Sequence, residues 1–337
     1  MKVLVLAGGL SPERDVSLSS GCLIANALME CGYEVALTDV LDDVEPSDAL
    51  FHTGMATPYA YTIPEREPDL RALRQKHPGN ALIGSGVLEL CRLADVVFLG
   101  LHGGMGENGQ LQATLDVHGI RYTGSSYEGC VLAMNKGLTK RLLNAESIPT
   151  PRGVVITNGG IPANITYPCF VKPLCGGSSI GTSRADDEAA LKKAISDARV
   201  YEQAVLVENM IHGREFSVGI LDRRVLPPIE IIPRQGFYDY AGKYQAGLIR
   251  EICPADLTAA QTSRAIELAQ RIFNTLSLRD YARIDFILDD VSGDFVCLEA
   301  NTLPGMTPTS LLPQEARAVG IEYREVCRKI VELALSR

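Results

Sequence analysis

The chain has 337 residues, of which 46% are apolar and 22% charged, the balance of a globular protein and not of a disordered one. Its 32 basic and 41 acidic residues give a net charge of −9, which argues against general nucleic-acid binding. No apolar run approaches the roughly 20 residues that cross a bilayer, and nine cysteines without a C-x-x-C pair favour reduced thiols over a disulfide framework. We therefore expect a cytoplasmic protein of two or three domains that binds neither membrane nor nucleic acid.

The first part of the chain alternates strands and helices. Apolar runs predict strands at 3–6, 35–37 and 96–99, with a helix over 17–31 that Gly32 terminates. This alternation predicts a parallel sheet, in which ligands bind at the carboxyl ends of the strands. Two glycine pairs, at 8–9 and 103–104, follow strands at those ends.

The remaining elements divide the chain into three predicted domains, 1–124, 125–213 and 214–337. Within the first, 42–86 holds four prolines and is interpreted as an insertion with one short helix near Arg71. The second has a basic helix over 135–145 and strands at 170–172 and 205–208 around a helix over 187–199. The third has a helix over 258–276, which a Thr258–Gln261 capping box opens, and a last helix over 323–335.

The segment 283–301 predicts two strands joined by a tight turn at 290–293. If the register is symmetric about Ser292, Asp285 lies opposite Glu299, and Arg283 lies opposite Asn301. Two facing carboxylates repel each other unless a divalent cation lies between them. Two carboxylates and an amide oxygen suit magnesium when phosphate supplies the other ligands. An ordinary exposed strand face, with residues 284, 286, 298 and 300 buried behind it, would have the same pattern.

A second constellation is a lysine at a strand end, Lys172, followed by the loop Gly176-Gly177-Ser178-Ser179. Glycines allow backbone N–H groups to approach phosphate oxygens, serines donate further hydrogen bonds, and lysine supplies charge. Lys136, on the preceding basic helix, is a second cation that could reach the same phosphates. The alternatives are a surface hairpin loop and a solvated surface lysine. The strand over 205–208 leads toward Glu215, and together they could bind an adenine edge and ribose hydroxyls.

Five segments in this order make the chain resemble the D-alanine–D-alanine ligase family of the ATP-grasp superfamily. The resemblance covers the chain from Gly8 to about Gly320, apart from the insertion. The segments are GGLSPERDVSL at 8–18, LHGGMGENG at 101–109, KPLCGGSSIG at 172–181, FYDYAGKY at 237–244 and RIDFILDDVSGDFVCLEANTLPGMT at 283–307. The resemblance implies an α/β chain with a Rossmann-like N-terminal parallel-sheet domain followed by a two-part ATP-grasp fold.

The resemblance also implies an activity and its site. Family members are cytoplasmic homodimers that phosphorylate one D-alanine with ATP and magnesium, then let a second D-alanine attack the acyl phosphate, for peptidoglycan synthesis. By similarity the implied catalytic residues are Glu13, Ser178, Tyr244 and Arg283, and the implied substrate-binding residues are Glu13, His102, Gly305, Ser310 and Leu311. The implied ATP-binding residues are Lys136, Lys172, Ser178, Glu208, Ile211, Glu215 and Lys243, and the implied ligands of two magnesium (or manganese) ions are Asp285, Glu299 and Asn301.

Three alternatives remain open on sequence grounds. D-Serine could be the second substrate, whereas Tyr244 argues against D-lactate because depsipeptide-forming relatives carry histidine there. An NAD-dependent oxidoreductase is suggested by the opening strand and Gly8-Gly9, but the G-x-G-x-x-G spacing is absent there. The third alternative is a nucleotide-binding regulator without catalysis.

Overall fold

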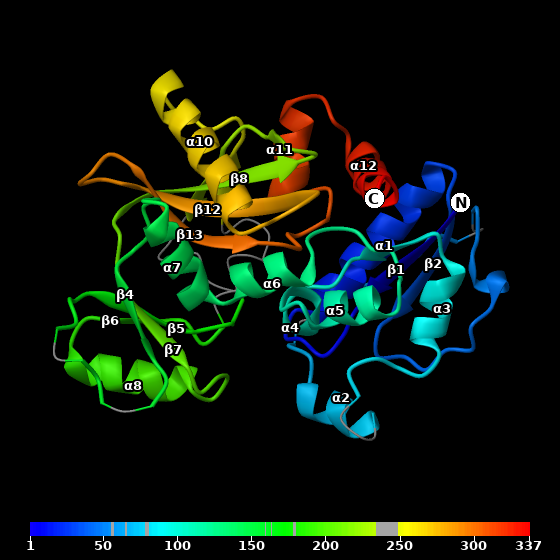
Figure 1. The fold of residues 1–337 in the computed structure, drawn as a ribbon, viewed down its shortest axis with the longest axis horizontal. Coiled ribbons are helices and arrows are strands. Elements are labelled where there is room, and N and C mark those ends of the chain that lie inside the picture. The colour runs from blue at the N-terminus through cyan, green and yellow to red at the C-terminus, as the bar shows by residue number, and fades with distance from the viewer. Residues whose placement is uncertain are drawn as a thin grey trace.

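The computed structural model of the chain describes residues 1–54, 57–64, 66–77, 81–158, 160–162, 164–177, 180–233 and 249–337. Within these residues the strands form three sheets that follow one another along the chain (Figure 1). The N-terminal sheet has three strands, the central sheet four and the C-terminal sheet six.

The N-terminal sheet is parallel, as predicted, with the strand order β2-β1-β3. Its strands are β1 (Lys2–Ala7), β2 (Glu34–Asp39) and β3 (Val96–Leu99). The side chains of Val3 to Ala7 are fully buried, as a parallel strand covered on both faces requires. Helix α1 (Arg14–Glu30) begins three residues before its predicted start and ends before Gly32, whose φ of +86° lies in the left-handed region that glycine adopts easily.

The predicted insertion packs on α1. Its short helix near Arg71 is present as α2 (Leu70–Lys76), and a 3₁₀ turn, η1, spans Asp48–Leu50. Asn26 of α1 exchanges hydrogen bonds of 2.8 and 3.0 Å with the backbone of Tyr59, and the Tyr61 hydroxyl donates to Asp15 at 2.5 Å. The segment is therefore fastened to the helix that begins directly after Glu13.

Five helices connect β3 and the insertion to the central sheet. They are α3 (Val87–Leu93), α4 (Gly104–Glu107), α5 (Gln110–Val117), α6 (Tyr127–Met134) and α7 (Lys136–Ala145). Helix α7 is the predicted basic helix, and the Asn135 side chain caps its N-terminus.

The central sheet has the order β4-β7-β5-β6 with antiparallel neighbours. Its elements are β4 (Gly153–Ile156), β5 (Cys169–Pro173), β6 (Ser183–Ala185), α8 (Glu188–Ala198) and β7 (Val205–Asn209). The predicted strands and the helix between them are confirmed, and α8 packs into the same hydrophobic cluster as β5 and β7.

The C-terminal sheet has the order β11-β10-β8-β12-β13, with the short β9 beside β8. Its strands are β8 (Gly213–Leu221), β9 (Arg224–Val225), β10 (Ile229–Pro233), β11 (Ile249–Ile252), β12 (Tyr281–Asp289) and β13 (Phe295–Asn301). Helix α10 (Ala259–Thr275) packs against this sheet and begins at the predicted Thr258 capping box.

The β12–β13 hairpin has the predicted register at its functional end. Arg283 pairs with Asn301 and Asp285 with Glu299, but Phe286 pairs with Cys297, so a β-bulge leaves Leu298 without a partner. The prediction that Leu298 lies on the face opposite the carboxylates is therefore wrong. Leu298 is partly buried and lines the same cavity as Glu299.

The last two helices are α11 (Leu311–Ala318) and α12 (Tyr323–Leu335), the latter with its predicted bounds. Helix α12 lies beside α1 (Figure 1), and its apolar residues Val326, Ile330 and Val331 belong to the hydrophobic core of the N-terminal sheet. The end of the chain thus returns to its beginning.

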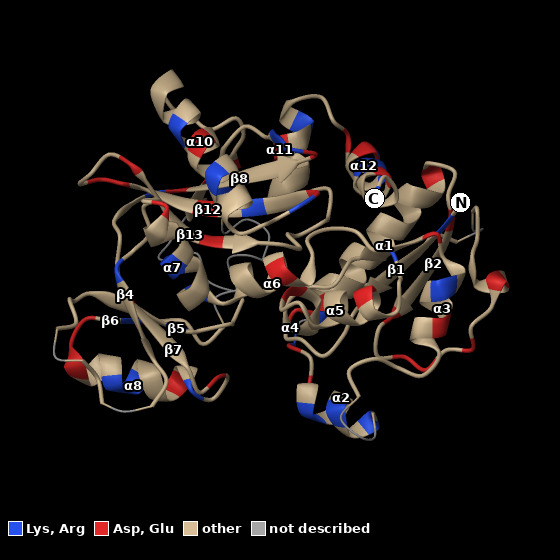
Figure 2. Cartoon of the chain, viewed as in Figure 1, with Lys and Arg blue, Asp and Glu red and all other residues tan. Residues whose placement is uncertain are grey.

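Acidic and basic residues are interspersed over most elements (Figure 2). All nine cysteines are free, as expected. Among the described residues, the structure contains no helix with both the length and the apolar character that a membrane span requires.

Candidate active site

A cavity of about 430 Å³ is bounded by the central sheet and the β12–β13 hairpin. It collects most of the predicted nucleotide and metal residues. Its charged lining residues are Lys136, Lys172, Arg184, Glu208, Glu215, Asp285 and Glu299. Its apolar lining includes Phe170, Ile211, Ile287 and Leu298. The cavity therefore combines charged side chains with apolar walls that are available to a flat ring.

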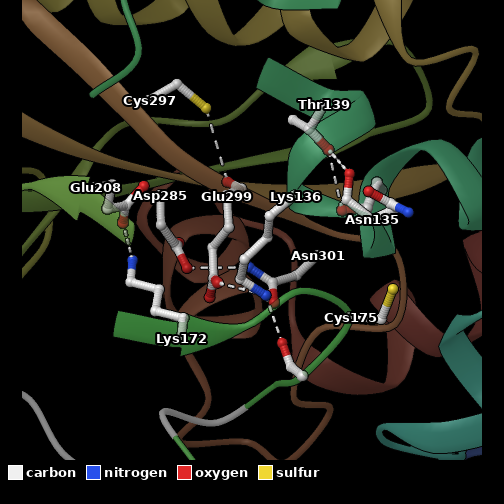
Figure 3. Close-up of polar contacts among 12 residues, drawn as sticks. Asn135, Lys136, Thr139, Lys172, Cys175, Glu208, Asp285, Cys297, Glu299 and Asn301 are labelled. Atoms are coloured by element: carbon white, nitrogen blue, oxygen red, sulfur yellow. Dashed lines mark hydrogen bonds and ion pairs between the residues drawn. The ribbon is translucent and has the colours of Figure 1, made fainter. Parts of the chain in front are cut away.

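Two neighbouring strands place a buried ion cluster in this cavity. Phe170 of β5 pairs with Glu208 of β7, so Lys172, two residues on, lies diagonally across from Glu208 on the same face. The buried Glu208 carboxylate forms an ion pair with Lys172 (Figure 3). It forms a second ion pair, at 2.8 Å, with Lys140 of α7.

Burial alone would raise the pKa of Glu208, but the two lysines outweigh it and the pKa is lowered. Burial lowers the pKa of Lys140, whereas for Lys172 the Glu208 carboxylate outweighs burial and the pKa is raised. Lys172 is therefore held as a cation inside the cavity.

The facing acids of the hairpin share the opposite wall. Asp285 is 6% exposed, and its carboxylate accepts two hydrogen bonds from Arg283 at 2.7 and 2.9 Å. It also accepts from Ser217 on β8 and from the Asn301 amide, both at 3.0 Å. In Figure 3 Asp285, Glu299 and Asn301 point toward one another and toward Lys136, whose ammonium lies 3.9 Å from Glu299.

The donor chemistry here fits a hard divalent cation. Two carboxylates and an amide are oxygen donors, which magnesium prefers. Among the described residues no group of three His, Cys, Asp or Glu side chains could hold a metal. Magnesium bound at Asp285, Glu299 and Asn301 would take its remaining ligands from phosphate or water oxygens. The charged lining has four carboxylates against three cations, which disfavours a bare triphosphate but accommodates one that carries divalent cations.

The glycine-rich loop approaches this cavity from the central sheet. The Lys136 ammonium donates to the Gly176 carbonyl, and the Glu202 carboxylate accepts from the Cys175 N–H at 2.6 Å. Ser178, Lys243 and Tyr244, which were predicted to act here, lie outside the described residues.

Glu13 approaches the same loop from the N-terminal sheet. It is 8% exposed and lies at the start of α1. A Cβ atom added to Gly177 would lie 3.4 Å from a Glu13 carboxylate oxygen, and one added to Gly103 would lie 2.8 Å from it. The predicted first-substrate residue and the residue before Ser178 are therefore adjacent, although they are far apart in the sequence.

His102 follows β3, and both of its ring nitrogens face protein groups. Nδ1 lies 3.1 Å from the Leu303 carbonyl, and Nε2 lies 3.3 Å from the Ser20 hydroxyl. Burial lowers the pKa of His102, so the ring is neutral at neutral pH. A carbonyl only accepts, so Nδ1 carries the proton and Nε2 accepts from Ser20.

Two of the predicted second-substrate residues, Gly305 and Ser310, lie between β13 and α11, and the third, Leu311, is the first residue of α11. The Ser310 hydroxyl accepts from the Thr307 N–H at 3.0 Å, and a Cβ atom added to Gly305 would lie 2.9 Å from that hydroxyl oxygen. The side chain of Leu311 is buried in a small cluster with Ile229 and Ile231. The structure thus brings Gly305 and Ser310 together, whereas the side chain of Leu311 packs inward.

Three residues of the site were not singled out from the sequence. Lys140 had a signal, because it lies one helical turn after Lys136 on a helix that was recognised as basic. Glu107 lies within a quoted motif, but nothing in its spacing indicated its partners. Ser217 had no signal, because only the pairing of β8 with β12 places it opposite Asp285.

Comparisons with known proteins agree with this geometry. The family model described as "D-ala D-ala ligase N-terminus" matches residues 2–125, and "D-ala D-ala ligase C-terminus" matches 157–332. A relative from Pediococcus pentosaceus named D-alanine–D-alanine ligase is 40% identical, over 98% of this chain and 97% of its own length. One from Nitratidesulfovibrio vulgaris with that name is 37% identical, over 100% and 99%.

A solved structure of similar fold is the D-alanine–D-alanine ligase from Bacillus anthracis complexed with ATP. It has a TM-score of 0.78 and 26% sequence identity, with 100% of this chain and 98% of that chain covered. The likeness extends over all three sheets, which confirms the predicted fold class.

Proposed function

The chain belongs to the D-alanine–D-alanine ligase family, and on that premise we propose that it joins two D-alanines to D-alanyl-D-alanine with ATP as co-substrate, for cell-wall peptidoglycan synthesis. The observation that carries the proposal is the cavity in which cations from the central sheet face paired acids of the hairpin. The names of the relatives do not favour a ligase that adds D-serine.

The chemistry explains why ATP is needed. A carboxylate is a poor electrophile with a poor leaving group, and transfer of the γ-phosphoryl of ATP to the first D-alanine improves both. The amine of the second D-alanine then attacks the acyl-phosphate carbonyl, and phosphate leaves. Catalysis of this kind depends mainly on positioning and charge neutralisation.

The basic side chains of the cavity bind the phosphates. Lys136 and Lys172 neutralise phosphate oxygens, with Lys243 as a third cation. Glu208, Ile211 and Glu215 surround the adenine and ribose, where the apolar wall covers the ring. Two magnesium ions (or manganese), held by Asp285, Glu299 and Asn301, would neutralise the charge of the triphosphate when bound.

The substrates bind on the other side of the acid pair. Glu13 accepts hydrogen bonds from the ammonium group of the first D-alanine, and Ser178 and Tyr244 close the site over it. His102 lies near the first carboxylate. Arg283, which Asp285 holds in a bidentate pair, stabilises the oxyanion of the tetrahedral intermediate. The second D-alanine binds at the Gly305 backbone, Ser310 and Leu311.

Three further parts of the proposal concern the whole chain. The domains are 1–124, 125–213 and 214–337, and the three sheets fall within these ranges apart from the first residue of β8. The working form is a homodimer. Its location is the cytoplasm, where ATP and D-alanine are available.

Product analysis tests the proposal. Purified chain with ATP, magnesium and an equimolar mixture of D-alanine and D-serine should release ADP and yield D-alanyl-D-alanine as the main dipeptide in mass spectrometry. If the main product were instead D-alanyl-D-serine, the second substrate would be D-serine and not D-alanine. Nucleotide binding without ADP formation on addition of D-alanine would contradict ligation altogether.

A further inference from the structure

The backbone of Leu303 is held from both sides by the segment that follows β3. Its N–H donates to Glu107 Oε1 at 3.3 Å, and its carbonyl accepts from His102 Nδ1 at 3.1 Å. His102 lies just before α4, and Glu107 is the last residue of that helix. One short segment of the N-terminal domain therefore binds both the N–H and the carbonyl of Leu303, which belongs to the C-terminal domain.

The second oxygen of Glu107 binds the loop that precedes α4, the helix to which Glu107 belongs. Oε2 accepts from the Gly103 N–H at 2.7 Å, and Gly103 has a φ of +65°, which favours glycine. Both carboxylate oxygens therefore accept from backbone N–H groups of different segments. Glu107 bridges the loop that contacts Glu13 and the loop that follows the acid pair.

Leu303 lies between a predicted metal ligand and a predicted second-substrate residue. It lies two residues after Asn301, at the end of β13, and two residues before Gly305. Glu107, Glu299 and Asn301 also line one small cavity beside the nucleotide cavity. A displacement of Leu303 would move Asn301 and Gly305 relative to Glu13, and such misplacements can slow a reaction by about 10²-fold for each ångström.

The stability of the fold does not by itself explain why a carboxylate, that of Glu107, lies between these two backbone N–H groups. Burial and the neighbouring Glu13 raise the pKa of Glu107 to about 7, which means that its charged form is disfavoured in the fold. The two backbone N–H groups offset this only in part. The charged Glu107 side chain is therefore locally unfavourable for the free energy of folding.

We propose that Glu107 is a positioning residue for ligation: together with His102 it fixes the Leu303 backbone and so sets the distance between the first-substrate site at Glu13 and the second-substrate loop at Gly305. This rests on the proposed function, because the two ends of the bridge matter only if two substrates must meet there. The Glu107 oxygens bind the backbone N–H groups of Gly103 and Leu303, so the proposed role of Glu107 is to position other groups.

The sharpest variant is Glu107→Gln, which keeps the shape but offers one acceptor oxygen where two N–H groups need acceptors. Its control is Glu128→Gln, an exposed carboxylate on α6. We expect dipeptide formation in Glu107→Gln to fall roughly 10- to 100-fold and the KM of the second D-alanine to rise. The Kd of ATP and the melting temperature should stay within the range of the control.

A double-mutant cycle tests the shared target. His102→Asn keeps a donor near the Leu303 carbonyl but shortens its reach. Because both side chains act on one peptide unit, the double variant should be little slower than the slower single variant. Effects that multiply would mean that the two residues act separately, and would overturn the proposal.

Two further results would overturn it. One is that Glu107→Gln matches the control in all parameters. The other is that the ATP affinity and melting temperature fall in parallel with the rate, which would indicate a general packing role. If the wild-type chain makes no dipeptide in the same assay, the proposed function fails, and this inference fails with it. If the wild-type chain makes the dipeptide and the Glu107 variant makes it equally well, only the inference is contradicted.

Discussion

Four buried or partly buried carboxylates in and around the site differ in how their charge is balanced. Asp285 is paired with Arg283, Glu208 with two lysines, and Glu107 with two backbone N–H groups. Glu315, on α11, is fully buried, and among the described residues neither of its oxygens has a hydrogen-bond partner. The pKa of Glu208 is lowered by its lysines, whereas burial raises the pKa of Glu107 and of Glu315.

Glu315 leads to a prediction about stability and pH. Burial raises the pKa of Glu315 well above its usual range, so the folded chain binds a proton that the unfolded chain releases above its ordinary pKa of 4.5. Stability therefore falls as pH rises from about 4.5 toward the raised pKa. Glu315→Gln removes this loss, and we expect it to increase the free energy of unfolding at pH 8 by more than at pH 5.

Urea unfolding at both pH values measures this effect, with the exposed Glu45→Gln as control. Each unit of pKa shift corresponds to about 1.4 kcal/mol, so the difference between the two pH values should be well resolved. An equal effect of Glu315→Gln at pH 5 and pH 8 would show that the carboxyl does not titrate across this range.

At the scale of elements, the bulge in the β12–β13 hairpin places two consecutive residues, Leu298 and Glu299, along one cavity. An alternating strand would bury one of them. The bulge thus supplies an apolar contact beside the Glu299 carboxylate. Leu288, on β12, belongs instead to the core behind the sheet.

This difference predicts separable effects of two leucine truncations. Leu298→Ala should weaken ATP binding roughly 5- to 20-fold, because about 1–2 kcal/mol of apolar contact with the nucleotide is lost. The melting temperature of the free chain should change little. Leu288→Ala should lower the melting temperature by several degrees and leave the Kd of ATP nearly unchanged. Calorimetric titration measures the Kd of ATP, and thermal unfolding measures the melting temperature, for both variants. Weaker ATP binding in Leu288→Ala but not in Leu298→Ala would contradict the prediction.

Local patterns made about half of the elements predictable from the sequence. The capping box at Thr258, the final helix and the pairing of Asp285 with Glu299 all follow from short-range rules. The bulge at Leu298 does not, because alternation treats every strand residue alike. The helices α3, α4, α5, α6 and α11 were also missed, as were the strands β4, β6, β9, β10 and β11. Most of them are short, and a segment such as the four residues of α4 carries too little periodicity to be recognised.

At the scale of the whole molecule, the site combines segments that only the tertiary fold brings together. Glu13 lies near Gly177, Lys140 pairs with Glu208, and Leu303 is bound by Glu107. Periodicity within a segment contains no information about such contacts. The residue types of the site were therefore predictable from the sequence and the resemblance, whereas Ser217 and the two-sided contact at Leu303 were not.

The central claim is that the facing acids of the hairpin hold divalent cations that the triphosphate brings with it. Binding of Mn²⁺, followed by electron paramagnetic resonance with and without a non-hydrolysable ATP analogue, tests it most directly. We predict tight Mn²⁺ binding only in the presence of the analogue, roughly 10-fold or more weaker in Asp285→Asn and in Glu299→Gln, and unchanged in Glu45→Gln. Equal Mn²⁺ binding by all four proteins would contradict the account.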